Sequence, residues 1–153
     1  MVENGNYTLR ASPVAGVGGT YATSNGTFKI VTTAAQGPSS FGRQTWKITA
    51  VEGKKDTYTI VLLHGHDISL GGSWSLKDNK AVPHGPIITT EEVIEWHITP
   101  TNNEIPNTYY IQPITKAVGA SYYVGTDEDN QVVINVIPGI LLPPDIEAYW
   151  QFL

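Results

Sequence analysis

The feature that most constrains the fold is a threefold repeat with a period of about 50 residues. A tyrosine begins three strand-like segments, at Tyr7, Tyr58 and Tyr109. A tryptophan begins or nearly begins three others, at Trp46, Trp96 and Trp150. A fixed period of this length is typical of a fold that uses one supersecondary unit per repeat.

Two more β-prone segments lie between each tyrosine and its tryptophan. The first kind combines glycine with a small or hydroxyl residue and an aromatic: GVGGTYA from Gly16, SLGGSWS from Ser69 and AVGASYY from Ala117. The second kind comprises TFKIV from Thr27, NKAVP from Asn79 and QVVINV from Gln131. Each repeat therefore predicts four strands, and three repeats predict twelve.

Twelve short strands in three fourfold units predict an all-β fold, the β-trefoil. We expect one domain spanning residues 1–153, with repeats at about 1–51, 52–103 and 104–153. Six strands would close a barrel and six would form capping hairpins, with the repeated tyrosines and tryptophans in the core. A propeller is disfavoured because three blades are fewer than the usual minimum of four.

Composition excludes several classes of function. The net charge is −5, and the nine basic residues are scattered rather than clustered, so we expect no nucleic-acid partner. No stretch approaches the ~20 apolar residues of a membrane span. The chain has no cysteine and its first residues do not resemble a signal peptide. We therefore expect a cytoplasmic monomer, with secretion left open.

Residues suited to catalysis are not arranged for it. His64-Gly-His66-Asp67 has a spacing that metal sites use, but the sequence offers no clear third and fourth ligand. No serine lies in a G-x-S-x-G context, and there is no cysteine nucleophile. We expect a protein without enzyme activity, cofactor or metal.

Function is expected in the loops, where the repeats differ from one another. The loop at 12–19, SPVAGVGG, is rich in glycine and uncharged. It lacks the lysine and the following helix of a phosphate loop. Two interpretations remain: a tight turn that needs positive φ, or a bare backbone that approaches another surface closely. The long loop at 32–44 is polar and low in charge, and we expect both loops at one end of the first repeat.

The residues YTLRA, GVGGTYAT followed by NG, and Q-x-W-x-I-T resemble the fungal mycocypins, and the clitocypins in particular. The similarity is strongest over roughly the first 60 residues. It implies a β-trefoil inhibitor of papain-like cysteine proteases whose two loops occupy the protease cleft non-covalently. By this resemblance, the protease-binding residues are Gly16, Val17, Gly18 and Gly19 in one loop, and Gln36, Gly37, Pro38, Ser39, Ser40, Phe41, Gly42 and Arg43 in the other.

Clitocypins also inhibit legumain through an asparagine in the loop between the first two strands of the second repeat. The corresponding segment is HGHDISL, and it contains no asparagine. His66 and Asp67 lie nearest the family position, and a protonated aspartate resembles asparagine in shape. The missing asparagine nevertheless argues against legumain inhibition.

Two alternative functions remain open. A trypsin-type inhibitor needs an exposed basic residue on an extended loop, for which the candidates are Arg43, Lys54, Lys55 and Lys116. A ricin-B-like lectin is suggested by the single Q-x-W at Gln44-Thr-Trp46. For the lectin, a sugar site would draw on Tyr122, Tyr123, Asp127 and Asn130.

Overall fold

The computed structural model describes residues 2–63, 68–115, 119–138 and 147–153. Its strands are β1 (Gly5–Tyr7), β2 (Leu9–Ala11), β3 (Tyr21–Thr23), β4 (Thr32–Ala34), β5 (Trp46–Ala50), β6 (Thr57–Leu62), β7 (Ser73–Leu76), β8 (Ile87–Thr90), β9 (Trp96–Pro100), β10 (Thr108–Pro113), β11 (Ala120–Thr126), β12 (Val132–Pro138) and β13 (Trp150–Phe152). Three short 3₁₀ helices join them: η1 (Phe41–Arg43), η2 (Ile68–Leu70) and η3 (Lys77–Asn79). None of the helices in these ranges is long and apolar enough to cross a membrane.

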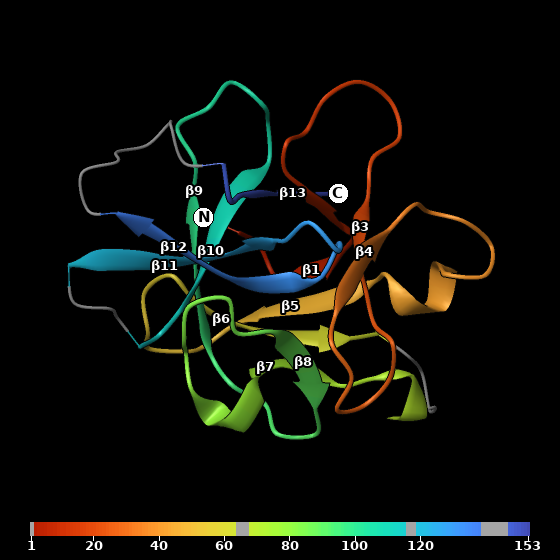
Figure 1. Cartoon of the computed structure of the whole chain (residues 1–153), viewed down its shortest axis with the longest axis horizontal. Coiled ribbons are helices and arrows are strands. Elements are labelled where there is room, and N and C mark those ends of the chain that lie inside the picture. The colour runs from red at the N-terminus through yellow and green to blue at the C-terminus, as the bar shows by residue number, and fades with distance from the viewer. Residues whose placement is uncertain (1, 64–67, 116–118, 139–146) are drawn as a thin grey trace.

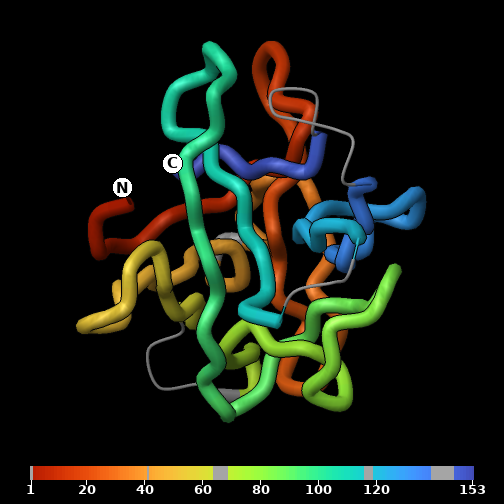
Figure 2. The backbone as a smooth tube through the Cα atoms, turned by 90° about the vertical axis from the view of Figure 1, so that its left-hand side faces the viewer, coloured from red at the N-terminus to blue at the C-terminus, as the bar shows by residue number. Residues whose placement is uncertain are grey.

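A closed barrel forms the body of the molecule (Figure 1). The strands pair in the order β1-β5-β6-β9-β10-β13-β2. Only Thr8 separates β1 from β2, so these two are halves of one strand and the ring closes. Thr8 and Leu153 exchange backbone hydrogen bonds at this seam, where the first and last strands meet (Figure 2). Closure leaves the barrel without free sheet edges.

Three hairpins cap the barrel: β3–β4, β7–β8 and β11–β12. Isolated bridges join each hairpin to the other two: Ile30 with Ile88, Thr32 with Gln131, and Pro86 with Val133. The hairpins thus form a triangular lid. This is the predicted β-trefoil, with thirteen strands instead of twelve because the first strand is split in two.

The repeat is also visible in the core, where inward-facing side chains come in threes. The members of each triplet are at most 2% exposed: Leu9, Ile60 and Ile111; Ile48, Ile98 and Phe152; Trp46, Trp96 and Trp150. Alternation along each strand sends every second residue inward, so a repeated sequence produces stacked layers in the barrel.

The repeated tryptophans join the barrel to its lid. Each indole N–H donates to a backbone carbonyl on the first strand of its own repeat's hairpin: Trp46 to Ala22 (3.0 Å), Trp96 to Trp74 (3.1 Å) and Trp150 to Val124 (2.8 Å). The three acceptor residues occupy equivalent positions in the three hairpins, and Trp74 has by far the largest side chain among them. Trp74 therefore fills the space around the threefold axis and contacts the other three indoles edge-on, at centroid distances of 5.7 to 6.2 Å.

Some sequence predictions need correction. The strand expected at NKAVP is a turn, because η3 and the positive φ of Asp78 and Asn79 break the extended chain, and the strand is β8 instead. TFKIV likewise precedes its strand, since Phe28 has a φ of +66°. Among the expected core tyrosines, Tyr58 is buried, whereas Tyr7 and Tyr109 are half-buried and pack against Phe152 at the barrel opening.

Trp74→Ala should destabilise the fold by about 3–5 kcal/mol, because it opens a cavity among three other indoles that cannot all move inward. Urea unfolding monitored by circular dichroism measures the change. Val17→Ala, at a fully exposed position, is the control and should change the free energy of unfolding by less than about 0.5 kcal/mol. A loss below about 1 kcal/mol for Trp74→Ala would show that Trp74 does not support the axis.

Candidate functional site

Two loops leave the first repeat at the same end of the β2–β3–β4 ladder (Figure 1). The first loop, residues 12–20, joins the end of β2 to the start of β3, and the second loop, residues 35–45, follows the end of β4. Because the three strands are antiparallel neighbours, these ends coincide. Tyr21 pairs with Ala34 there and forms the common base of both loops. The adjacency expected from the sequence is thus present.

The tip of the first loop is bare backbone. Residues 15–19 are exposed and Val17 is fully exposed. Gly16, Gly18 and Gly19 have φ values of +62°, +90° and +103°, a region that residues with a Cβ rarely occupy. A Cβ on Gly16 or Gly18 would meet no atom within 4 Å, so these two glycines are required by conformation and not by packing. The interpretation as a turn that needs positive φ is confirmed, and the exposed tip is open to solvent, so a close approach to another surface stays a prediction.

A buried arginine supports this loop from below. The Arg10 side chain of β2 donates from Nη2 to the carbonyl oxygens of Ala15 (2.8 Å) and Gly16 (3.2 Å). Only 8% of Arg10 is exposed, and its Nε is buried without a partner. The one ion pair within the described ranges lies elsewhere, between Lys54 and Glu95. A Cβ at Gly19 would collide with the guanidinium group, which explains the third glycine.

The second loop is held by its own hydrogen bonds. Ser40 donates its N–H to the Gly37 carbonyl (3.0 Å), and Arg43 donates to Ser40 (2.9 Å) as η1 forms. Gln44 is 2% exposed, and its amide donates to Thr23 Oγ1 (3.0 Å) and to the carbonyls of Ala34 and Ala35. The glutamine of the Q-x-W motif therefore anchors this loop. Phe41 begins η1, but its side chain lies outside the described part.

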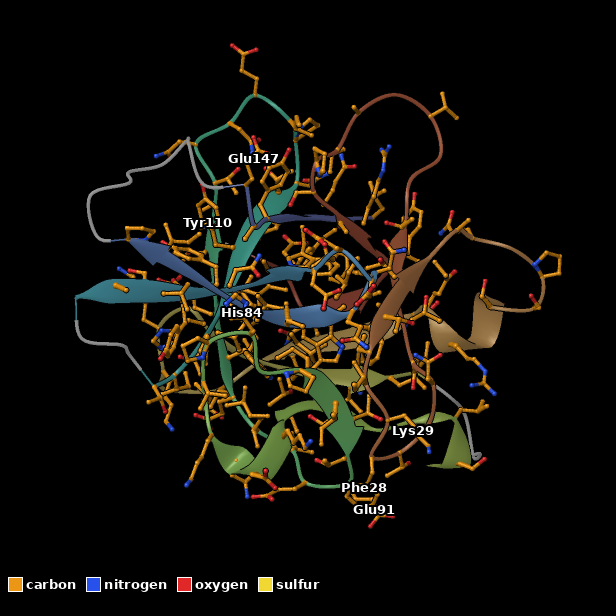
Figure 3. All side chains as sticks on the ribbon, viewed as in Figure 1. Phe28, Lys29, His84, Glu91, Tyr110 and Glu147 are labelled. Carbon is orange, nitrogen blue, oxygen red and sulfur yellow. The ribbon has the colours of Figure 1, made fainter. Side chains whose placement is uncertain are left out.

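The surface of the two loops is nearly neutral. Arg43 is the one charged residue in both loops together. The base of the first loop is tied down where the Ser12 hydroxyl donates to the Glu147 carbonyl and Tyr149 Oη accepts from the Val14 N–H (3.3 Å). The exposed Phe28 lies at the other end of the molecule from Glu147 (Figure 3), so it does not extend this surface.

The family model described as "Peptidase inhibitor clitocypin" matches residues 5–152. The chain belongs to the clitocypin family of peptidase inhibitors. The resemblance inferred from the first 60 residues is confirmed over nearly the whole chain. Because the family consists of inhibitors, the prediction that the chain is not an enzyme is also confirmed.

Solved structures support the fold of this clitocypin-family chain. The Rhizoctonia solani agglutinin matches with a TM-score of 0.69 at 12% identity, covering 100% of this chain and 96% of that one. A designed threefold-symmetric protein, ThreeFoil, matches with a TM-score of 0.59 at 14% identity, with 97% of each chain covered. At these identities the likeness concerns the fold alone. No curated protein sequence matches this chain significantly.

The basic residues considered for a trypsin-type inhibitor are not on extended loops. Arg43 is half-buried and ends a 3₁₀ helix. Lys54 lies in the tight turn between β5 and β6, where its ammonium group pairs with Glu95 at 2.8 Å. Lys55 follows in the same turn, and Lys116 is outside the described residues. In this clitocypin-family fold, none of the three described residues (Arg43, Lys54 and Lys55) therefore lies on an extended loop of the kind that a trypsin-type inhibitor uses.

The four residues considered for a sugar site do not converge. Tyr122 and Tyr123 are successive residues of β11 and point to opposite faces. Tyr123 packs against Tyr110 at 5.2 Å. Asp127 Oδ1 is occupied by the N–H groups of Asp129 and Gln131, and Asn130 has a positive φ in the same turn. Asp127 and Asn130 thus shape the β11–β12 turn.

Other candidates fall outside the structure's described part. His64, His66 and Asp67 belong to residues 64–67, so neither the metal spacing nor the legumain position is examined by the structure. In the described ranges, no group of three or more histidine, aspartate or glutamate side chains is placed to hold a metal ion.

Sequence reasoning missed the two residues that shape the loops, Arg10 and Gln44. Nothing in the sequence signalled Arg10, because alternation with Leu9 and Ala11 places it on the outer face of the strand, and only the structure shows that all three residues are buried. A buried arginine without an acidic partner needs backbone carbonyls as acceptors. The carbonyls that serve it could be identified only from the folded loop.

Arg10→Met should loosen the first loop while leaving the barrel intact. We expect the ¹⁵N order parameters of residues 15–18 to fall from about 0.85 to about 0.6 or below, because the two carbonyl contacts are lost. The free energy of unfolding should change by less than about 2 kcal/mol, since losing hydrogen bonds to a cation is offset by no longer burying its charge.

Arg43→Met is the matched control, because it removes the other arginine of the chain without touching the first loop. Unchanged order parameters for residues 15–18 in Arg10→Met would show that the loop is rigid without the guanidinium group.

Proposed function

We propose that this protein inhibits papain-like cysteine proteases by placing the first and second loops in the active-site cleft without forming a covalent bond. Membership of a peptidase-inhibitor family supports inhibition of a protease. The choice of a cysteine protease follows the resemblance to the clitocypins, and the choice of these loops is supported by the conformation of the first loop.

The observation that carries the proposal is the direction of the loop's peptide groups. The carbonyls of Ala15 and Gly16 face inward to Arg10. In a planar trans peptide the N–H points opposite to the carbonyl, so the N–H groups of Gly16 and Val17 face outward. A protease thiolate attacks a carbonyl carbon, and at this tip it would meet N–H donors instead.

The backbone conformation also argues against cleavage. A substrate binds a protease cleft as an extended strand, which requires negative φ and large positive ψ. Gly16, Gly18 and Gly19 all have positive φ, so this stretch cannot lie in a substrate's register. With three glycines around Val17, the backbone can approach the catalytic cysteine closely while presenting one small side chain.

The affinity for the protease would come from the area buried in the interface and from the rigidity of the two loops. A standard inhibitor interface buries about 800 Å² on each partner, more than one short loop offers, so the second loop is needed as well. Arg10 and Gln44 hold the two loops in place before binding, which lowers the entropy lost in the complex. The low charge of both loops keeps the cost of desolvation small.

Gly18→Trp should weaken papain inhibition by about thirtyfold or more, a loss of the size seen when the centre of an interface is disrupted. A bulky side chain at this position would enter the space between loop and cleft. Papain activity titrated with the inhibitor at fixed substrate measures the change, and circular dichroism verifies the fold.

Gly53→Trp is a closely matched control. Gly53 has a similar φ of +81°, and a Cβ there also meets no atom within 4 Å, but it lies in the β5–β6 turn. It should inhibit like the original protein. Full inhibition by Gly18→Trp would refute the assignment of the first loop, and inhibition of trypsin with papain untouched would refute the choice of protease class.

A further inference from the structure

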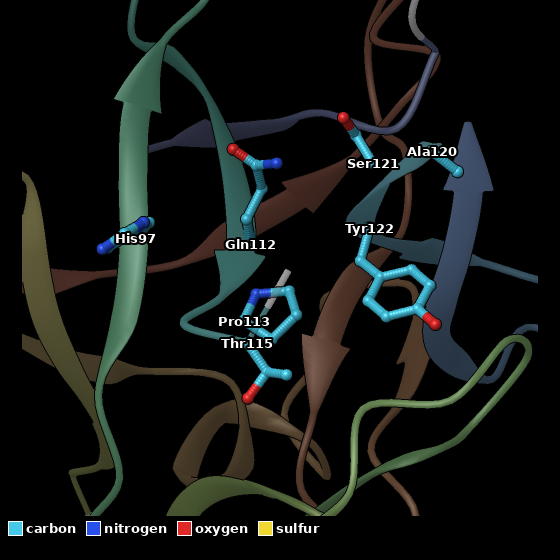
Figure 4. A pocket seen from close by; sticks show the side chains of 7 residues that line it. All are labelled: His97, Gln112, Pro113, Thr115, Ala120, Ser121 and Tyr122. Carbon is cyan, nitrogen blue, oxygen red and sulfur yellow. The ribbon is translucent and has the colours of Figure 1, made fainter. Parts of the chain in front are cut away.

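A polar cavity of about 270 Å³ lies between β9 of the second repeat and β10 and β11 of the third (Figure 4). His97 and Gln112 face each other as paired residues of β9 and β10. Ser121 and Tyr122 come from β11, and Thr115 follows the end of β10. Three strands from two repeats therefore contribute to one hollow, and none of them carries the first or second loop.

The polar side chains around this cavity have unused hydrogen-bonding capacity. Within the described ranges, His97, Gln112, Thr115, Ser121 and Tyr122 make no side-chain hydrogen bond to another protein group. By contrast, the position that corresponds to Gln112 in the first repeat is Arg10, whose side chain donates hydrogen bonds to the first loop. The third repeat thus leaves donors and acceptors facing an open space.

The chemistry of the lining indicates the class of ligand. Among the described residues that line the cavity there is no lysine, arginine, aspartate or glutamate, so a charged ligand would find no counterion among them. Amide, imidazole and hydroxyl groups supply both donors and acceptors, which is what a ligand rich in hydroxyl groups requires. The volume is at the lower end for small-molecule sites and suits a single ring. The Tyr122 ring adds an apolar wall.

A second hollow of about 330 Å³ adjoins the first and shares Pro113 and Thr115 with it. Its lining includes the apolar side chains of Leu76, Ile94, Val93 and Ile114, the last two exposed, together with Glu95, whose carboxylate pairs with Lys54. An apolar substituent on the ring would be placed there, where its burial releases water from these side chains.

We propose that the cavity between β9, β10 and β11 binds a neutral monosaccharide unit that carries an apolar substituent in the adjoining hollow. This site is independent of protease inhibition, because it uses other strands and another repeat. It also differs from the sugar site considered from sequence, with which it shares Tyr122 alone.

The test is a ¹H–¹⁵N NMR titration of the whole chain with methyl and p-nitrophenyl β-glycosides of glucose, galactose, mannose, N-acetylglucosamine and N-acetylgalactosamine. For at least one sugar we expect shifts centred on residues 96–97, 112–115 and 120–122. The p-nitrophenyl glycoside of that sugar should bind about tenfold more tightly than the methyl glycoside, because its ring enters the apolar hollow.

Gln112→Ala should weaken binding of that glycoside by about tenfold, the effect of losing one or two hydrogen bonds. Gln131→Ala, in the β11–β12 turn, is the matched control and should bind normally. The proposal fails if no glycoside shifts these residues up to its solubility limit. It also fails if p-nitrophenol alone binds as tightly as its glycosides, or if both glutamine variants behave alike.

Discussion

The structure depends on one interaction made three times, the hydrogen bond from a barrel tryptophan to a carbonyl of the capping lid. Trp46, Trp96 and Trp150 are completely buried, and an unpaired indole N–H in such a place would cost about 1–3 kcal/mol. The three bonds fix the position of each hairpin over the barrel. They also bring three indoles to one axis, where Trp74 closes the remaining space.

Because the core is specified by this repeated pattern, the connecting loops are free to differ. The same position in the repeat, after the first barrel strand, carries the glycine-rich first loop in one copy. In the third copy, Thr115, which follows β10, lines the polar cavity. The scaffold explains how one small barrel can present two unlike surfaces, since neither surface contributes a residue to the triplets of the core.

The period of 50 residues was enough to predict the architecture, since the tyrosine and tryptophan strands occupy the barrel as expected. Strand positions within the lid were less predictable. NKAVP looks β-prone, yet two residues of positive φ make it a turn, and pairing with β7 selects Ile87–Thr90 instead. The closeness of the two loops followed from topology. Their shape did not, because it depends on Arg10 and Gln44 contacting atoms that only the fold brings near.

Arg10 shows how stability is given up for a fixed loop conformation in this fold. A buried guanidinium group without a carboxylate is expensive, and an apolar residue in the same strand would pack at lower cost. Among the described residues, the groups that accept hydrogen bonds from Arg10 are carbonyl oxygens of the first loop, so the charge turns those peptides inward and holds them. The barrel tolerates this because the tryptophan bonds and the layered core lie elsewhere. The buried charge therefore makes physical sense as a device that gives an otherwise glycine-rich loop a single conformation.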